Sequence, residues 1–432
     1  MRKIAIIIEL ILVVGAYTSS VSLDAVPYDY SVIDRHAINA PAKVTRSIPE
    51  LTAYLVKPAK NDREKARAIF RWISKNITYH IEAYLGDVKG QSDAESVLKN
   101  RKGVCGGYAR LFAAMAKEAG LNVKVISGLA KEKMKFDPSM PDLQGHAWNV
   151  IELDGKWQAL DATGGGSSFW NEKTKHYEDI LVNFYFLIPP DRLRYEYFPN
   201  DPEWQLMKPH IDKDEFNRLP QLIFGYWNHS IELLSPKTDI EATEDKVEIR
   251  LKGPGDLVMI GVVLKGDVIL SRKASIDLNK MIQNSSFILK NGGLYTVKAV
   301  FPQKEVYYLI IVVKKKSDPD TLYQPVAIYR INVTKGSPMA YPQPTPLFYE
   351  EEITLLSPLE SNFLSGRKVS FELKSKKALQ VMVVQDNSNY VMLTKKGDLF
   401  KGEYTVPKGD FNVIAKFSDK EEFKPLLVYH GL

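Results

Sequence analysis

Apolar residues recur at helical spacing in two segments of the first third of the chain. The first segment begins at Asn61, a residue typical of an N-cap, with Glu64 placed to reach back to it. Its apolar stripe consists of Ala66, Ile69, Phe70 and Ile73. The second segment runs from the turn at 103–107 to a capping Gly120, with a stripe of Ala109, Phe112, Ala113 and Ala116. A capping box from Ser92 to Glu95 predicts a further short helix before that turn.

The period of the apolar positions changes to two after Gly120. Strands are predicted over residues 121–128, 145–153, 156–163 and 182–188. The pair Asp154-Gly155, which separates the second of these strands from the third, is the favoured two-residue hairpin turn. The alternation of helical and strand patterns makes residues 61–225 a predicted α+β unit.

Beyond residue 225 the chain is almost entirely strand-like and contains an internal repeat. Three pairs of segments match: 231–236 with 353–358, 246–252 with 368–374, and 293–301 with 409–417. The first two pairs lie 122 residues apart and the third 116, so the second copy is expected to be six residues shorter. We therefore predict two related β-sandwich, immunoglobulin-like domains over 226–337 and 350–432. The proline-rich stretch 338–349 is interpreted as a stiff linker between them.

The first 22 residues have the pattern of a secretory signal peptide. Arg2 and Lys3 precede an apolar run over 4–15, and small residues follow the run. We therefore expect an exported protein, secreted or held at the cell surface or in the periplasm; a hydrophobic N-terminal helix or anchor is the alternative. The run is too short to span a bilayer, so an integral membrane protein is not expected. Residues 23–60 are an N-terminal extension that either folds on the core or covers the active site as a pro-segment.

The composition is that of an ordinary globular protein. The 432 residues include 58 Lys and Arg and 52 Asp and Glu, a net charge of +6, with 45% apolar residues. Because basic and acidic residues are interleaved along the chain, nucleic acid is not an expected partner.

No cofactor or metal ion is expected. Apart from His146, the histidines show no metal-ligand spacing, and no acidic loop has calcium spacing. The glycine-rich run Gly164–Ser168 resembles a phosphate-binding loop but lacks its lysine and following helix. We interpret this run as a mobile loop beside the active site.

The hairpin turn also places two polar side chains close together. With Asp154-Gly155 as the loop, the numbers of opposed residues sum to 309. His146 then lies across from Thr163, and Trp148 lies across from Asp161. On this register His146 and Asp161 are diagonal neighbours on one face, roughly 7 to 8 Å apart at Cα. An imidazole and a carboxylate can hydrogen-bond across that gap, whereas a one-residue slip would separate them.

Cys105 is the only cysteine, so it forms no intramolecular disulfide and is either an inert buried thiol or a reactive one. Its predicted place at a helix N-terminus favours the thiolate. We predict a catalytic triad in which Cys105 attacks an acyl carbon, His146 moves the proton and Asp161 fixes the imidazole tautomer. Trp148 and the backbone N–H of Gly106 are candidate oxyanion or substrate-binding donors, although Trp148 is equally well explained as a packing residue.

Three motifs resemble those of the transglutaminase-like superfamily: 103–112 around the cysteine, 145–150 around the histidine and 157–162 around the aspartate. Residues 185–190 and 198–206 further resemble the subgroup named for kyphoscoliosis peptidase. The resemblance covers about 61–210 and implies a papain-like thiol fold, with helices packed on an antiparallel sheet. It also implies that Cys105, His146 and Asp161 have the catalytic roles described above. The chain departs from the subgroup at Tyr197, where a histidine is expected.

We therefore expect a secreted cysteine peptidase or amidase acting on peptide or amide bonds of a protein or peptide substrate. The same first half-reaction also serves a cross-linking transglutaminase, and the triad does not separate the two. A third hypothesis, from a different class, is a non-catalytic surface-binding or scaffold protein. Its sandwich domains would bind an extracellular or cell-wall ligand.

Overall fold

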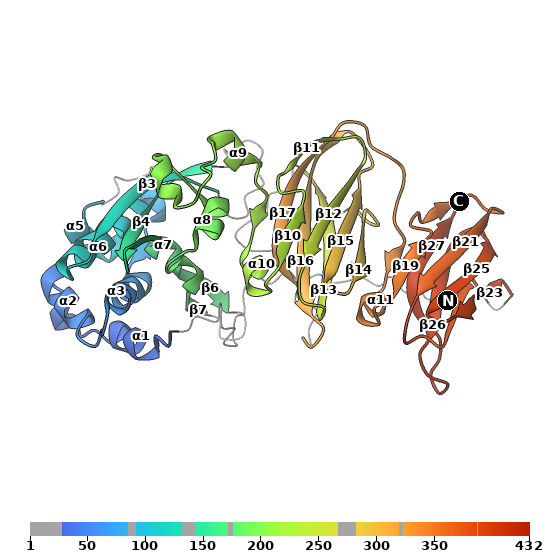
Figure 1. The fold of residues 1–432 in the computed structure, drawn as a ribbon, viewed down its shortest axis with the longest axis horizontal. Helices are drawn as coiled ribbons and strands as arrows, with labels where there is room; N and C mark the ends of the chain where they lie inside the picture. The colour runs from blue at the N-terminus through green and yellow to red at the C-terminus, as the bar shows by residue number, and fades with distance from the viewer. Residues whose placement is uncertain are drawn as a thin grey trace. The chain divides into compact units, whose positions relative to one another are not determined.

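The computed structural model describes residues 28–84, 92–131, 143–171, 176–266, 282–318, 323–386 and 388–432. The described chain divides after Arg218 into two compact units, a helical and mixed unit followed by a unit made mostly of strands (Figure 1). The predicted signal peptide, residues 1–22, lies outside the described residues. None of the described helices has the length and apolar character needed to cross a membrane.

The first unit contains seven helices of five residues or more among its described residues. They are α1 (Ser31–Ile38), α2 (Ile48–Leu55), α3 (Asp62–Asn76), α5 (Ala94–Asn100), α6 (Cys105–Glu118) and α8 (Pro190–Glu196), and a seventh, α9 (Lys213–Arg218), closes the unit. Every predicted stripe residue of α3 is fully buried, and those of α6 are at most 6% exposed, so both helical patterns are confirmed. Gly120 ends α6 at a positive φ of 78°, as its capping role requires.

The helix N-termini differ from the prediction in detail. Asn61 caps α3 by accepting from Glu64 N at 2.9 Å, but the Glu64 carboxylate accepts from Lys60 N instead of from the backbone of Asn61. The cap of α5 is Asp93, which accepts from Ser96 N at 2.9 Å. The predicted cap at Ser92 is therefore wrong by one residue. Aspartate and serine are both strong caps, and two adjacent candidates cannot be separated by composition alone.

The described part of the N-terminal extension folds on the core. Helix α1 packs on α3, and α2 packs on α3 and α6. Arg67 of α3 donates to both carboxylate oxygens of Asp34 of α1, each at 2.7 Å, and its side chain is only 3% exposed. A bidentate ion pair in a buried setting fixes the relative position of two helices more firmly than a surface pair does.

A four-stranded antiparallel sheet carries the candidate site, in the order β5-β4-β3-β8. Its strands are β3 (Val123–Lys131), β4 (Leu143–Leu153), β5 (Lys156–Leu160) and β8 (Tyr197–Pro199). The pairs from Asn149↔Leu160 to Leu153↔Lys156 follow the predicted register, which is confirmed over these residues. The predicted pairing of His146 with Thr163 and of Trp148 with Asp161 is wrong, because β5 ends at Leu160. Asp154 and Gly155 have φ values of 52° and 70°, the conformation that a type I′ turn requires.

Two predicted strands are shorter or absent. The strand predicted over 156–163 ends at Leu160, because Asp161 instead caps the short helix α7 (Ala162–Gly165). The strand predicted over 182–188 is wrong: residues Asn183–Tyr185 form a 3-10 turn, η2, and Ile188 makes a single bridge to Ala159. The apolar run of 182–188 is buried in a turn, and a short apolar run does not by itself distinguish a strand from other buried backbone.

The glycine run predicted as a mobile loop is packed tightly where the structure describes it. A Cβ on Gly164 would lie 2.8 Å from the ring of Tyr185, and one on Gly165 would lie 2.3 Å from the ring of Phe70. These glycines let α7 approach the core, and the following Gly166–Asn171 forms strand β6, which pairs with β7 (His176–Leu181). The mobile-loop interpretation is therefore wrong for this run.

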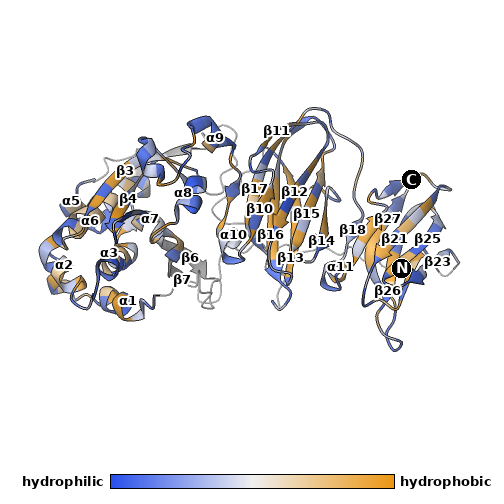
Figure 2. Ribbon diagram, in the orientation of Figure 1, coloured by the Kyte–Doolittle hydropathy of each residue, from blue (hydrophilic) through white to orange (hydrophobic). Residues whose placement is uncertain are grey.

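The second unit consists of two sandwiches that each pair a four-stranded sheet with a larger one. In the first sandwich the sheets are β10-β12-β15-β14 and β11-β17-β16-β13, with β9 added on β17. Its strands are β9 (Gln221–Leu222), β10 (Glu232–Ser235), β11 (Ile240–Thr243), β12 (Lys246–Lys252), β13 (Leu257–Lys265), β14 (Ser286–Asn291), β15 (Leu294–Val300), β16 (Glu305–Lys315) and β17 (Gln324–Val333). Apolar residues run along these strands (Figure 2).

The second sandwich has the sheets β19-β21-β25-β24 and β18-β27-β26-β22-β23, with β20 added on β27. Its strands are β18 (Gln343–Pro344), β19 (Thr354–Ser357), β20 (Asn362–Phe363), β21 (Lys368–Lys374), β22 (Gln380–Val384), β23 (Tyr390–Met392), β24 (Thr394–Lys396), β25 (Leu399–Thr405), β26 (Gly409–Lys416) and β27 (Lys424–Gly431). The two four-stranded sheets have corresponding strand orders, and β17-β16-β13 of the larger sheet corresponds to β27-β26-β22, so the two sandwiches share a topology.

Two of the three repeat matches hold, and the third is wrong. Strands β10 and β12 correspond to β19 and β21 at the predicted offset. Strand β15, however, pairs with β12 and so corresponds to β25, whereas the predicted β26 lies in the other sheet. Alternating strands of similar composition match one another by period alone, regardless of the sheet they join. A further shared contact supports the correspondence: Tyr329 donates to Pro236 O and Tyr429 to Pro358 O.

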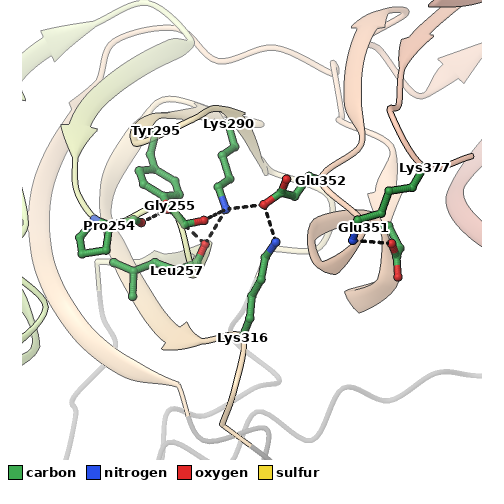
Figure 3. Close-up of polar contacts among 9 residues, drawn as sticks. All are labelled: Pro254, Gly255, Leu257, Lys290, Tyr295, Lys316, Glu351, Glu352 and Lys377. Carbon is green, nitrogen blue, oxygen red and sulfur yellow. Dashed lines mark hydrogen bonds and ion pairs between the residues drawn. The ribbon is translucent and has the colours of Figure 1, made fainter. Parts of the chain in front are cut away.

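The proline-rich stretch 338–349 contains β18 and most of helix α11 (Pro346–Glu350), and its aromatic side chains are buried. Phe348 packs on Phe287 of the first sandwich, with ring centroids 5.5 Å apart. Close to it in the sequence, Glu352 forms ion pairs through Oε1 with Nζ of Lys316, at 2.5 Å, and with Nζ of Lys290, at 3.8 Å (Figure 3). Through Phe348 the stretch therefore packs on the first sandwich, and Glu352, just after the stretch, pairs with two lysines of the same sandwich.

Candidate active site

Cys105 is the first residue of α6. Its helix is capped by the backbone of Val104 with no side-chain cap, so the backbone N–H groups of the first turn are not occupied by a capping side chain. The strands β1 (Thr78–Tyr79) and β2 (Lys102–Gly103) pair in parallel immediately before it, and Tyr79 lies opposite Gly103. This bridge and the packing of α6 on β3 and β4 fix where the helix begins. The thiol is thus held at a defined helix N-terminus beside the sheet.

The surroundings of Cys105 favour its thiolate. Burial raises the pKa of the thiol, but a hydrogen bond and a charge interaction with His146 lower it. The backbone N–H groups of Ala147 and Gly106 also donate to the sulfur, and the net result is a pKa below the ordinary value. The oxyanion or substrate-binding role predicted for Gly106 is a different one and stays a prediction. Ala147 is a further backbone donor near the thiol that sequence reasoning missed.

His146 lies on β4, with its side chain 16% exposed. Its Nε2 is 2.9 Å from Oδ2 of Asp161, which leaves Nδ1 as the ring nitrogen for the thiol. Burial lowers the pKa of the imidazole, but the Asp161 carboxylate and the Cys105 sulfur raise it well above its ordinary value. A lowered thiol pKa next to a raised imidazole pKa is the condition for a thiolate–imidazolium pair.

Asp161 is 2% exposed and ionised despite its burial. Its Oδ2 accepts from His146 and, at 2.7 Å, from the hydroxyl of Tyr197, while its Oδ1 accepts from Thr163 N at 2.8 Å. Burial raises the pKa of this carboxyl, but the charge of His146 and the hydrogen bonds of His146 and Tyr197 lower it by more, and the net pKa is about 2. Asp161 is also the N-cap of α7, so one side chain ends β5, starts a helix and holds the histidine.

Trp148 lies two residues from His146 on the same face of β4 and is fully buried. Its ring stacks beside that of His146, with centroids 6.2 Å apart. Its indole N–H is buried and has no hydrogen-bond partner among the described residues. The structure therefore places Trp148 beside the histidine and gives it a packing role.

Tyr197, the position at which the chain departs from the subgroup, lies in the site, where its hydroxyl donates to Asp161. It reaches the site from β8, where it lies opposite Ala130 of β3. The sequence signal that could have indicated this approach is Gly128, an isolated glycine inside a predicted strand. Gly128 lies between His146 and Pro199 in the sheet, and a Cβ there would be 2.2 Å from Phe198 O and 2.8 Å from Trp148 Cη2.

We expect Gly128→Ala to destabilise the first unit by about 1 to 3 kcal/mol, because the backbone of β8 would have to move away. Thermal unfolding measures the loss. The matched control is Gly145→Ala on β4, where a Cβ would have no neighbour within 4 Å. Equal melting temperatures for the two variants would show that Gly128 is not needed for the docking of β8.

No group of three or more metal-ligating side chains occurs among the described residues. The side chains and backbone groups of the site are a thiol, an imidazole, a carboxylate, a phenol and backbone donors. This set of groups is suited to nucleophilic and acid–base chemistry on an acyl group.

Comparison with known proteins gives two domain matches. Residues 49–162, which contain Cys105, His146 and Asp161, match the transglutaminase-like superfamily, and residues 213–344 match the KY-like, immunoglobulin-like domain. Mouse kyphoscoliosis peptidase is 29% identical over 224 residues, which cover 51% of this chain and 34% of that protein. Hillarin of Drosophila melanogaster is 30% identical over 222 residues, 47% of this chain and 26% of that protein.

A solved structure described as that of a TGase is 20% identical, covers 31% of this chain and 36% of its own, and has a TM-score of 0.21. The chain spans only about a quarter to a third of the length of the two curated relatives. The first matched range lies within the first, α+β unit, and the second covers the first sandwich. The chain thus has a domain of the transglutaminase-like superfamily followed by a KY-like immunoglobulin-like domain, and it resembles the kyphoscoliosis peptidase subgroup.

Proposed function

We propose that this protein is a thiol-dependent acyl-transfer enzyme that acts on the peptide or amide bonds of a protein or peptide substrate. The observation that carries the proposal is the connected set of contacts from Cys105 through His146 to Asp161. Each contact supports the next, since the carboxylate raises the pKa of the imidazole and the imidazolium lowers the pKa of the thiol.

The reaction then follows from these protonation states. The Cys105 thiolate adds to the carbonyl carbon, and the backbone donors at the helix start, together with Trp148, are the candidates to stabilise the oxyanion. His146 gives its proton to the leaving amine as the C–N bond breaks, which leaves a thioester on Cys105 and a neutral imidazole. The imidazole then removes a proton from the second substrate, whose attack releases the acyl group and restores the thiolate–imidazolium pair.

The second substrate decides between two activities. Water makes the protein a peptidase or amidase, and an amine such as lysine makes it a cross-linking transferase. We favour hydrolysis, and the support is that relatives at 29% identity are named peptidases. Digestion of casein or peptidoglycan peptides should be compared with incorporation of a fluorescent amine. Amine incorporation without hydrolysis would overturn the preference for a hydrolase.

The activated thiol can be tested without knowing the substrate. Because Cys105 is the only cysteine, the pH dependence of iodoacetamide alkylation reports on one thiol. We expect the midpoint to lie below the free-thiol value of about 8.5. In His146→Ala, alkylation at pH 6.5 should slow by about tenfold or more, since the opposite charge is removed. A wild-type midpoint at or above the free value would count against a nucleophilic role.

Export of the protein and ligand binding by the sandwiches remain proposals. The support for export is the signal-like pattern of residues 1–22, and N-terminal sequencing of protein recovered outside the cytoplasm tests it. The support for a ligand is the immunoglobulin-like domain, a fold that commonly serves binding. An extracellular or cell-wall ligand would suit an exported protein.

A further inference from the structure

Three aromatic rings stack over one position of the sheet. The ring of Tyr197 lies 5.4 Å from that of His146 at an interplanar angle of 10°, and 5.0 Å from that of Trp148 at 27°. His146 and Trp148 come from β4 and Tyr197 from β8, while Gly128 of β3 lies between those two strands. Because Gly128 has no side chain, the rings meet across the middle strand. The imidazole is thus held against the Tyr197 ring on one face.

The hydroxyl of Tyr197 makes a second contact, with the carboxylate that holds the same imidazole. Its donor reaches Oδ2 of Asp161 at 2.7 Å, the oxygen that also accepts from His146 Nε2. Tyr197 is 5% exposed, so water does not readily replace this bond. Burial and the neighbouring carboxylate raise the pKa of the phenol well above its ordinary value, so it remains a donor at every pH at which the enzyme would work.

We propose that Tyr197 is a positioning residue for the Cys105–His146 pair. Its hydroxyl fixes the direction of Asp161 Oδ2, and its ring fixes the plane of the imidazole, so that Nδ1 of His146 faces the thiol. The inference rests on the proposed thiol chemistry. It also explains the departure from the expected histidine at this position, because both residues provide a planar ring and a hydrogen-bond donor.

The substitution Tyr197→Phe separates the two contacts, since it keeps the ring and removes only the donor. We expect the pH profile of Cys105 alkylation to move to higher pH, with alkylation at pH 6.5 slowed by about threefold to tenfold, the size expected for one charge-assisted hydrogen bond. Tyr197→Leu removes the ring as well, and its profile should move further. A purely structural role would lower the melting temperature and leave the profile in place.

The matched control is Tyr108→Phe. Tyr108 is also buried, and its hydroxyl donates to a backbone carbonyl, Ile77 O, at 2.6 Å instead of to the triad. We expect a comparable loss of thermal stability in this variant and an unchanged alkylation profile. The inference is overturned if the alkylation profile of Tyr197→Phe superimposes on that of the wild type, or if Tyr108→Phe moves the profile by as much as Tyr197→Phe does. A wild-type profile with the free-thiol midpoint would instead contradict the proposed function itself, so the two failures are distinguishable.

Discussion

Cys105→Ala is expected to abolish both peptide hydrolysis and amine incorporation, with a loss of at least about 10⁴-fold in turnover, since no acyl-enzyme can form without the nucleophile. The fold should be retained, because alanine is a good helix former and Cys105 is only half-buried at the first position of α6. Turnover of casein and of a fluorescent amine measures the first expectation, and thermal unfolding the second.

Cys105→Ser sharpens the test, because serine keeps the shape and a hydrogen-bonding group but lacks the acidity of the thiol. An activity that survives in Cys105→Ala would place the nucleophile elsewhere. A biological effect that persists in Cys105→Ala, while turnover is lost, would support the alternative hypothesis. In that hypothesis the sandwiches bind a surface ligand and the thiol domain serves as a platform.

The central pair of the site could be predicted because its geometry is local. His146 lies on β4, and Asp161 directly follows β5, the strand that a two-residue loop joins to β4. The turn chemistry of Asp154-Gly155 sets the register of these two strands. The position of Cys105 at a helix start follows in the same way from the apolar stripe of α6, which begins at Ala109, four residues after the cysteine. Each of these predictions depends on residues that are close in the sequence.

Tyr197 could not be predicted in this way because its contacts are not local. It reaches His146 through β8, a three-residue strand whose partners on β3 lie about 70 positions earlier in the chain. Three residues are too few to show a period. The same limit explains the misplaced third repeat, since an alternating pattern says which face of a strand is buried and not which sheet the strand joins.

Asp161 shows how one residue can carry signals that conflict in the sequence. Its place two residues after Ala159, in an alternating pattern, favours a strand, whereas its short carboxylate side chain favours a helix N-cap. The structure shows the N-cap. The cap was missed because the helix it starts is only four residues long and rich in glycine. Both oxygens of the carboxylate are consequently occupied, one by the cap and one by the site.

Because both carboxylate oxygens are occupied, Asp161→Asn is an informative substitution at the triad. An amide has one acceptor oxygen, whereas the wild-type side chain accepts from Thr163 N through Oδ1 and from both His146 and Tyr197 through Oδ2. Whichever way the amide points, its NH₂ group faces a donor. With NH₂ toward Nε2, the neutral imidazole must carry its proton on Nδ1 and cannot accept the proton of the thiol.

We expect turnover of Asp161→Asn to fall by about 10² to 10⁴-fold and its stability by about 1 to 3 kcal/mol, the cost of an unsatisfied buried donor. The control is Asp93→Asn at the N-cap of α5, where the side chain accepts from Ser96 N and has no contact with the triad residues in the structure described. Asparagine caps a helix about as well as aspartate, so this variant should retain both turnover and stability. Parallel losses in the two variants would attribute the effect to helix capping instead of to the triad.

The pH dependence of unfolding gives an independent check of the Asp161→Asn prediction. Because the folded-state pKa of Asp161 is lowered to about 2, its ionised form contributes stability that is fully present above the unfolded value of about 3.9. That contribution is lost as the pH falls through about 2. The difference in melting temperature between wild type and Asp161→Asn should therefore be largest above about pH 4 and should narrow toward pH 2. A difference that stays constant over this range would mean that the carboxylate is not stabilised by His146 and Tyr197.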